Sequence, residues 1–123
     1  MHYLTLLHAE PTSTPPPPGV MPAIMALGQE ASTAGVLVTQ AGLEPSANGA
    51  QVSLVDDTIS VADGPFAETK ELLSYAVYDC RSLGEAVEWS RRFLAVHQDN
   101  WPGWTGEITI HPVFVPPAAP PEP

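Results

Sequence analysis

Apolar residues recur along this chain with two spacings, one typical of β-strands and one typical of α-helices. Strand-like runs are short and separated by turn-forming residues; they occupy residues 2–8, 36–39, 75–80 and 108–115. Between the second and third runs, apolar and polar residues alternate on both sides of Asp56-Asp57. This alternation predicts a β-hairpin that turns at the aspartate pair.

Two further segments have helical spacing. The first opens at Met21-Pro22, because proline is tolerated in a first helical turn, and Gly35 is a natural stop. The second opens at Ser82, since serine followed three residues later by glutamate is the capping-box pattern, and it is expected to end near Leu94. One face of this second helix is predicted to pack against the domain: Leu83, Ala86, Val87, Ser90 and Leu94.

The order of these elements predicts an α+β fold. Without the hairpin, the chain reads strand, helix, strand, strand, helix, strand, which is the βαββαβ arrangement of ferredoxin-like folds. We therefore expect an antiparallel sheet with both helices on one face and with the hairpin as an insertion. Hydrophobic residues on the other face would need a partner, so a homodimer is expected.

The folded part is predicted to be a single domain, residues 1–115, because 123 residues suit one hydrophobic core. Prolines crowd residues 11–19, inside this domain, and residues 116–123, after it. We expect the first segment to be an extended connecting loop and the second to be a disordered tail. The alternative is that a proline-rich segment recruits a partner.

Charge and cysteine content limit the kinds of binding partner and the cellular compartment that we expect for this protein. Fourteen acidic residues against four basic ones give a net charge of -10, the wrong sign for binding nucleic-acid phosphates or a membrane surface. No apolar run is long enough to span a bilayer, and no leader-like segment opens the chain. The single cysteine, Cys80, has apolar neighbours, which predicts core packing rather than a reactive thiol. Together these features predict a cytoplasmic protein.

Residues 62–71 hold an aspartate, a turn, an aromatic residue and the only lysine of the chain. Asp63 is followed by Gly64-Pro65, turn chemistry that can hold a carboxylate in one place. Beside Phe66 this carboxylate could be partly desolvated, so Asp63 is the candidate catalytic acid or base. The alternative is that Asp63 only forms hydrogen bonds within its own turn.

The residues after this turn are candidates for substrate binding. Lys70 would be the natural partner of a substrate carboxylate or enolate, because it is a lone ammonium in an acidic protein. Glu68 could join Lys70 and Glu71 in a charge network that positions Asp63, or it could belong to a solvated segment. Phe66 either touches the ligand or anchors the loop in the core.

His8, at the end of the first strand, is the candidate acid–base partner, with a structural histidine as the alternative. Contact between His8 and His111, on the last strand, is not assured. No spacing of histidine, cysteine and glutamate supplies a metal site, and no phosphate-binding loop is present, so neither a metal nor a cofactor is expected. Trp101 and Trp104 are expected to pack over the domain or a dimer surface, with ligand stacking as the alternative.

The motif Asp63-Gly64-Pro65-Phe66, continued by Glu68-Thr69-Lys70-Glu71, resembles the signature of the DGPF-type proteins within the YCII-related family. Supporting similarities cover most of the chain: Tyr3-Leu4-x-Leu6-Leu7, Ala34-Gly35-Val36-Leu37, Gly42-Leu43-x-Pro45, Ser82-Leu83-x-Glu85-Ala86-Val87-Glu88-Trp89 and Ile110-x-Pro112-Val113. The resemblance implies a dimeric α+β barrel, in which two sheets pack face to face, with a cleft in each protomer. A charged pair common on the last strand of members is missing here, where the chain reads Thr109-Ile110-His111-Pro112.

Three functions are compatible with these patterns. The first is a cofactor-free acid–base enzyme that acts on a small carbonyl or enol metabolite around Asp63, by analogy to the fold. The second is a non-catalytic dimer that senses a small molecule and has a regulatory role, since genes of the resembled family often neighbour those of transcription-initiation sigma factors. The third is a structural dimer that recruits partners through its proline-rich segments.

Overall fold

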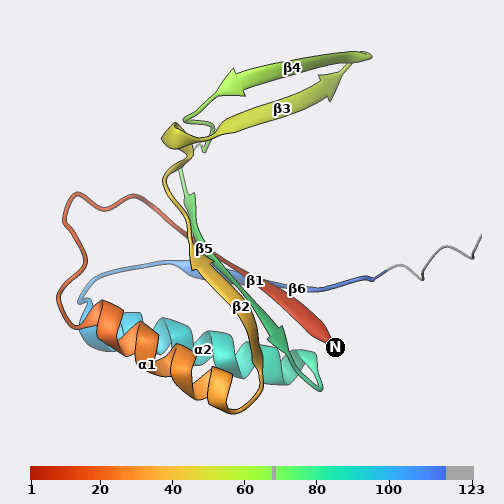
Figure 1. Ribbon diagram of the computed structural model, residues 1–123. Coiled ribbons are helices and arrows are strands. Elements are labelled where there is room, and N and C mark those ends of the chain that lie inside the picture. The colour runs from red at the N-terminus through yellow and green to blue at the C-terminus, as the bar shows by residue number, and fades with distance from the viewer. Residues whose placement is uncertain (68, 116–123) are drawn as a thin grey trace, which may run out of the picture.

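The computed structural model describes residues 1–67 and 69–115. Its elements follow the order expected from the hydrophobic pattern (Figure 1): β1 (His2–Ala9), α1 (Val20–Thr33), β2 (Leu37–Gly42), the short 3-10 helix η1 (Ser46–Asn48), β3 (Ala50–Val55), β4 (Thr58–Asp63), β5 (Glu71–Asp79), α2 (Leu83–Asn100) and β6 (Glu107–Pro112). The α+β class is therefore confirmed. The predicted proline-rich tail, residues 116–123, lies outside the described residues.

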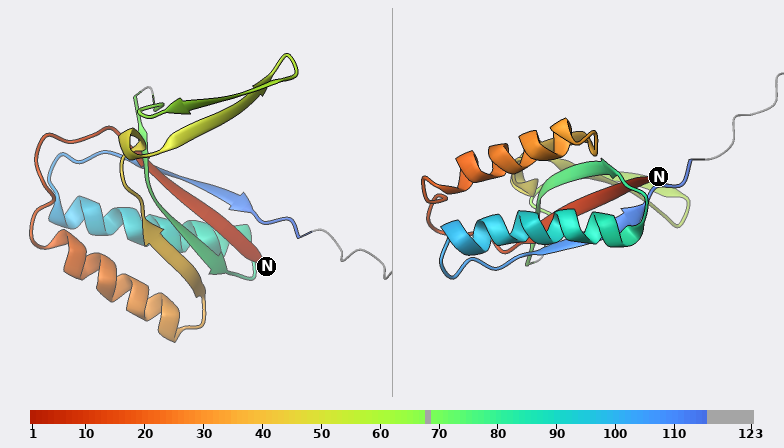
Figure 2. Two further views of the ribbon diagram at one scale, coloured as in Figure 1. Left: turned by 45° about the horizontal axis from the view of Figure 1, so that its top comes forward. Right: turned by 90° about the horizontal axis from the view of Figure 1, so that it is seen from below.

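Four strands form the main sheet, in the order β2-β5-β1-β6, and every neighbouring pair is antiparallel. Both helices lie on one face of this sheet, next to each other (Figure 2). The loop at residues 11–19 connects β1 to α1 and contains neither helix nor strand, as predicted. Neither helix of the described chain is both long and apolar enough to span a bilayer.

The two faces of the sheet differ in how far they are buried. Along β1, burial alternates: Tyr3, Thr5, Leu7 and Ala9 are buried, whereas the residues between them are half-buried. This is the period of two expected of a strand with one covered face. The helix-covered core also contains Ala31, Val36, Ala76, Tyr78, Cys80 and Ala86. On the opposite face no helix covers Leu4, Leu6, Tyr75 and Val77, which are only half-buried within the described chain.

The hairpin is confirmed as a separate two-stranded sheet of β3 and β4. Asp56 and Asp57 both have positive φ, 50° and 61°, as a two-residue turn that matches the strand twist requires. The hairpin projects away from the main sheet (Figure 1). Within the described chain, its apolar side chains are largely exposed. Four of them are 67–70% exposed: Val52, Leu54, Ile59 and Val61.

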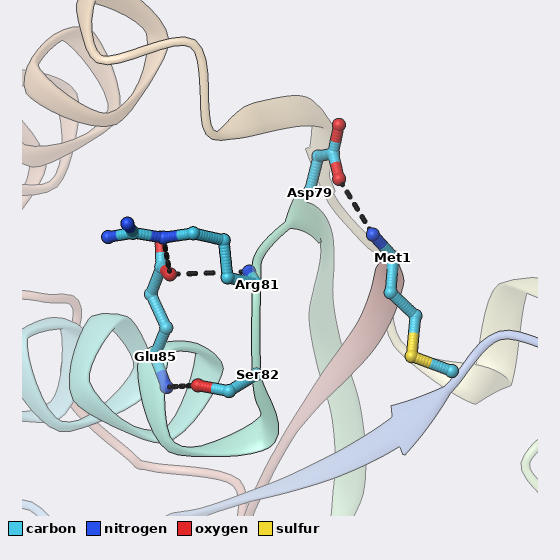
Figure 3. Close-up of polar contacts among 5 residues, drawn as sticks. All are labelled: Met1, Asp79, Arg81, Ser82 and Glu85. Carbon is cyan, nitrogen blue, oxygen red and sulfur yellow. Dashed lines mark hydrogen bonds and ion pairs between the residues drawn. The ribbon is translucent and has the colours of Figure 1, made fainter.

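Helix α2 begins as predicted (Figure 3). The Ser82 hydroxyl accepts a hydrogen bond from the Glu85 backbone N–H at 3.2 Å, which is one half of a capping box. The Glu85 carboxylate does not complete the box; it accepts hydrogen bonds from the backbone N–H and the guanidinium of Arg81 instead. Beside this junction, the N-terminal amine pairs with Asp79 at 3.1 Å and ties the start of β1 to the end of β5.

The predicted end of α2 was wrong. The helix continues six residues past Leu94 to Asn100, because His97 extends its buried face by another turn. The predicted inner face was also partly wrong, since Leu83 is 50% exposed and the buried residues are Ala86, Ser90 and His97. The inner face is thus set by small and polar residues rather than by leucine.

Several strand boundaries also differ from the expectation, and β2 ends at Gly42 rather than at residue 39. β5 begins at Glu71 rather than at Tyr75, so the strand follows almost directly on the turn after Asp63. A register shift after Leu7 then pairs His8 with Leu72. β6 ends at Pro112 rather than at residue 115. Cys80 is buried, and burial raises the pKa of its thiol, which agrees with the predicted packing role.

Candidate functional site

A cavity of about 370 Å³ lies where the hairpin joins the main sheet. Its walls come from the end of β1, the turn at residues 43–49, the loop that follows Asp63 and the start of β5. Among the side chains that line it are His8, Ser46, Phe66, Lys70, Glu71 and Leu72. The cavity therefore gathers an imidazole, an ammonium and a carboxylate around a small space.

Ser46 holds the walls of this cavity together. Its backbone N–H and its hydroxyl donate hydrogen bonds to the Glu71 carboxylate, at 3.1 Å and 2.8 Å. The same hydroxyl accepts a hydrogen bond from the Phe66 backbone N–H at 3.3 Å, since a hydroxyl can donate and accept at once. Ser46 thus links three segments: its own turn, the loop after Asp63 and the start of β5.

Gly64 is required by a close approach between two loops. Its backbone N–H donates to the Gly49 carbonyl at 2.9 Å, which brings it against the turn at Ser46. A Cβ at position 64 would overlap the Ser46 carbonyl group, so only glycine fits. The peptide bond between Gly64 and Pro65 is cis. The Asp-Gly-Pro-Phe motif therefore serves to seat the loop on the Ser46 turn.

Lys70 forms an ion pair with Glu107, at the start of β6. The hydrogen bond between them raises the pKa of Lys70 and lowers the pKa of Glu107. The nearby His8, which faces Glu107 across the β1/β6 pair, adds a smaller contribution that also lowers the pKa of Glu107. Both side chains of the ion pair are about half exposed, so the lysine can exchange this partner for a ligand.

The structure brings together only part of the predicted site. His8, Phe66 and Lys70 line the same cavity. Phe66 does not anchor the loop in the core, because it is 45% exposed. Glu68 lies outside the described residues.

Asp63 lies apart from these residues. It is the last residue of β4, pairs with Ala50 in the hairpin and is exposed. It lines neither this cavity nor a larger one under the helices. Of the residues considered for a charge network around Asp63, Glu71 binds Ser46 and Lys70 binds Glu107, and Glu68 is not described.

The two strand histidines do not form a pair. His8 lies opposite Glu107 on β6, whereas His111 lies opposite Leu4. Leu4 and His8 are four residues apart on β1, so the two histidines are separated by about 13 Å along the strand direction. The Nε2 atom of His111 lies 2.9 Å from the Thr109 hydroxyl. In the described part of the chain, no group of three histidine, cysteine, aspartate or glutamate side chains is arranged to hold a metal ion.

Sequence reasoning missed two residues of this site, Ser46 and Glu107. Ser46 lies in a segment rich in turn-forming residues, where nothing marks one serine as the contact point of two other segments. Glu107 could be placed next to His8 only once β6 was known to pair with β1 in this register. The only sequence signal for Glu107 was its position just before a segment in which apolar and polar residues alternate.

Comparison with known proteins gives two matches. The family model of the YCII-related domain matches residues 1–101, which include every described residue of the cavity. The uncharacterized protein R00369 of Rhizobium meliloti (strain 1021) is 40% identical over 73 residues, covering 58% of this chain and 59% of that protein. The first match spans well over half of the sequence, so the chain belongs to the YCII-related domain family.

Proposed function

We propose that the cavity beside His8 is an acid–base site and that the protein is a cofactor-free enzyme for a small carbonyl or enol compound. The observation that carries this proposal is the convergence of His8 and Lys70 on one cavity of about 370 Å³. Histidine is the side chain best suited to accept and return a proton near neutral pH. An ammonium group in the same cavity can stabilise negative charge that develops on the substrate.

In the proposed reaction, His8 removes a proton from the carbon next to the substrate carbonyl. The electron pair of the broken C–H bond moves to the carbonyl oxygen, and Lys70 stabilises the enolate by turning from Glu107 to this oxygen. His8 then returns the proton to oxygen or to another carbon, so the substrate is isomerised without any oxidant or reductant. Ser46 and Glu71 keep the walls in place, and Phe66 covers the substrate.

Isotope exchange at carbon tests this proposal without knowledge of the natural substrate. Pyruvate, 2-oxobutanoate and phenylpyruvate would be incubated with the protein in D₂O, and loss of their C3 protons would be followed by NMR. We expect exchange above the buffer rate, and a loss of at least a hundredfold in His8→Gln, the usual scale of general acid–base catalysis. His111→Gln, on the neighbouring strand β6, is the matched control and should exchange at the wild-type rate. No exchange in the wild type, or an unchanged rate in His8→Gln, would contradict the proposal.

We further propose that the chain belongs to the DGPF subgroup and forms a ferredoxin-like homodimer with the two sheets packed as an α+β barrel. The strand order β2-β5-β1-β6 supports this fold, and the half-buried face with Leu4, Leu6, Tyr75 and Val77 supports a partner. Sedimentation should show a dimer for the wild type and a monomer for Leu4→Glu. Leu83→Glu, which alters an apolar residue exposed on α2, should remain dimeric. A monomeric wild type would disprove the barrel.

Asp63 keeps a proposed catalytic role only in such an assembly. In one chain it does not line the cavity, so a second copy must cover the hairpin and close a site around its carboxylate. Asp63→Asn should then slow proton exchange in the dimer while leaving ligand binding intact. A wild-type exchange rate in this variant would remove Asp63 from the catalytic residues and leave His8 unaffected.

The second candidate is a regulatory dimer that binds a small molecule at this cavity without chemistry. The observation in its favour is that Asp63 does not line the cavity, which leaves one imidazole and no aspartate among its described lining residues. The same experiment separates the two functions. A sensor would bind one of the oxo acids, detected by calorimetry, and would lose this binding in Lys70→Ala, yet would show no proton exchange.

A further inference from the structure

A larger cavity, of about 690 Å³, lies between the sheet and the two helices. Thr5 and Leu7 line it from β1, on the strand face opposite to that of His8. Its volume falls within the range of about 300–1,000 Å³ typical of small-molecule sites. Among the residues that the structure describes, only Leu43 lines both cavities, so a ligand site in the larger one is independent of the function proposed for the His8 cavity.

Ser90 lines this cavity and carries a buried hydroxyl that no described residue satisfies. Its side chain is 5% exposed, and its hydroxyl has no hydrogen-bond partner in the part of the chain that the structure describes. A serine inside a helix can bond to the carbonyl four residues earlier, but this one does not. A buried hydroxyl without a partner is destabilising, so a bound molecule that pairs with it would gain affinity.

His97 and two aromatic rings form the wall two turns further along α2. The His97 ring is 4% exposed; it is stacked on Trp104 with centroids 4.3 Å apart and lies 5.2 Å from the Phe93 ring. Its Nδ1 atom is 3.0 Å from the Phe93 carbonyl oxygen, which can only accept. Nδ1 is therefore the donor, and Nε2 of the neutral ring is an acceptor.

The charge of the lining limits the class of ligand. Among the described residues, no lysine or arginine lines this cavity, and its one charged residue is Glu10, which is exposed. An anion would therefore be desolvated without any compensating cation, which is unfavourable. Met21 and Met25 line the cavity from α1 and are largely exposed, so flexible thioether side chains stand at its opening.

We propose that this cavity binds a neutral, mainly apolar ring compound that carries a hydroxyl group. The hydroxyl of the ligand pairs with Ser90, and its ring lies against His97 and Trp104. Ser90 and His97 are seven residues apart, about 10 Å along the helix axis, so a molecule with two fused rings spans the distance between them. The competing interpretation is an empty packing defect that no ligand enters.

Three probes of one size separate these interpretations: naphthalene, 2-naphthol and 2-naphthoate. Binding would be measured by calorimetry and by quenching of tryptophan fluorescence, because Trp101 and Trp104 line the cavity. The wild type should bind 2-naphthol about fivefold more tightly than naphthalene, the gain expected from one net hydrogen bond. It should bind 2-naphthoate most weakly.

Ser90→Ala should abolish the preference for 2-naphthol over naphthalene while leaving naphthalene binding unchanged. Ser32→Ala, which alters an exposed serine of α1, is the matched control and should keep the preference. Ser90→Leu should prevent binding of all three probes. If this variant fails to fold, the ratio of affinities for 2-naphthol and naphthalene in Ser90→Ala still tests the proposal. The proposal would be overturned if the wild type bound none of the probes, or if it bound 2-naphthoate most tightly. It would also be overturned if the ratio of affinities for 2-naphthol and naphthalene were the same in Ser90→Ala as in Ser32→Ala. His8→Gln should leave 2-naphthol binding unchanged, which separates this site from the acid–base cavity.

Discussion

The two candidate ligand sites of this protein are built by different means. The smaller one is made by turns and strand ends, carries charged side chains and is held by hydrogen bonds that converge on Ser46. The larger one is made by the inner faces of two helices and a sheet, and it is lined mainly by apolar and aromatic side chains. The polar site therefore depends on a few local contacts, whereas the apolar site depends on the packing of whole elements.

The largest expected effect comes from Gly64→Ala, which introduces a Cβ where the loop meets the Ser46 carbonyl group. We expect a loss of roughly 2–3 kcal/mol in the free energy of unfolding, measured by urea denaturation, because neither backbone can retreat easily. Proton exchange at the His8 cavity should fall, while 2-naphthol binding at the larger cavity should persist.

Gly84→Ala is the matched control, since a Cβ there meets nothing closer than the Ser82 hydroxyl at 3.8 Å. It should be neutral or slightly stabilising, because alanine is the better helix former. Loss of both cavities in Gly64→Ala would show that they form one cooperative unit rather than two separately built sites.

A smaller effect is expected from Glu71→Gln, which removes the charge that Ser46 binds through two hydrogen bonds. The free energy of unfolding should decrease by roughly 1–2 kcal/mol, since hydrogen bonds to a charged group are stronger than neutral ones. Combining it with Ser46→Ala should cost less than the sum of the two single changes, because both act on the hydrogen bond between the Ser46 hydroxyl and the side chain at position 71. Glu88→Gln, at an exposed helix position, is the control, and strictly additive losses would contradict the central role of Ser46.

The smallest effect concerns the ion pair of Lys70 and Glu107, which is exposed to solvent and screened by salt. The pKa of Glu107 is lowered in the folded protein, so its contribution to stability is present above the unfolded-state value near 4.5 and is lost as the pH falls through the lower folded value. The difference in stability between wild type and Glu107→Gln should therefore be small at pH 6 in low salt. It should decrease as the pH is lowered below 4.5 and as salt is added, and a difference independent of both pH and salt would show that the charge of Glu107 is not its cause.

Much of the fold could be predicted because its signals are local. The turn at Asp56 and Asp57, the cap at Ser82 and the alternation along β1 each depend on residues close together in the sequence. The predictions that failed concern burial, as at Leu83, or the end of an element, as at Asn100. The burial of a side chain and the end of a helix both depend on which other elements pack there. An amphipathic pattern does not specify how far the surface of those elements extends.

The candidate site was predictable only in part for the same reason. The motif at residues 63–71 led to Phe66 and Lys70, and both line the smaller cavity. It also pointed to Asp63, because adjacency in sequence suggested adjacency in space; Asp63 instead ends β4 and does not line the cavity. Ser46 and Glu107 belong to segments far from residues 63–71 in the sequence, and no local sequence pattern connects them to the site.

The sequence by itself determined the family, the α+β class, the order of the elements and the turn chemistry, because backbone propensity and hydrophobic period act over a few residues. Only the tertiary structure decided which side chains meet. The β1/β6 register sets His8 beside Glu107, the close approach at Gly64 binds the loop to Ser46, and the packing of α2 on the sheet leaves Ser90 in a cavity wall with its buried hydroxyl unpaired among the described residues. Such contacts join residues far apart in the chain, and their geometry depends on how strands pair and helices pack rather than on any one segment.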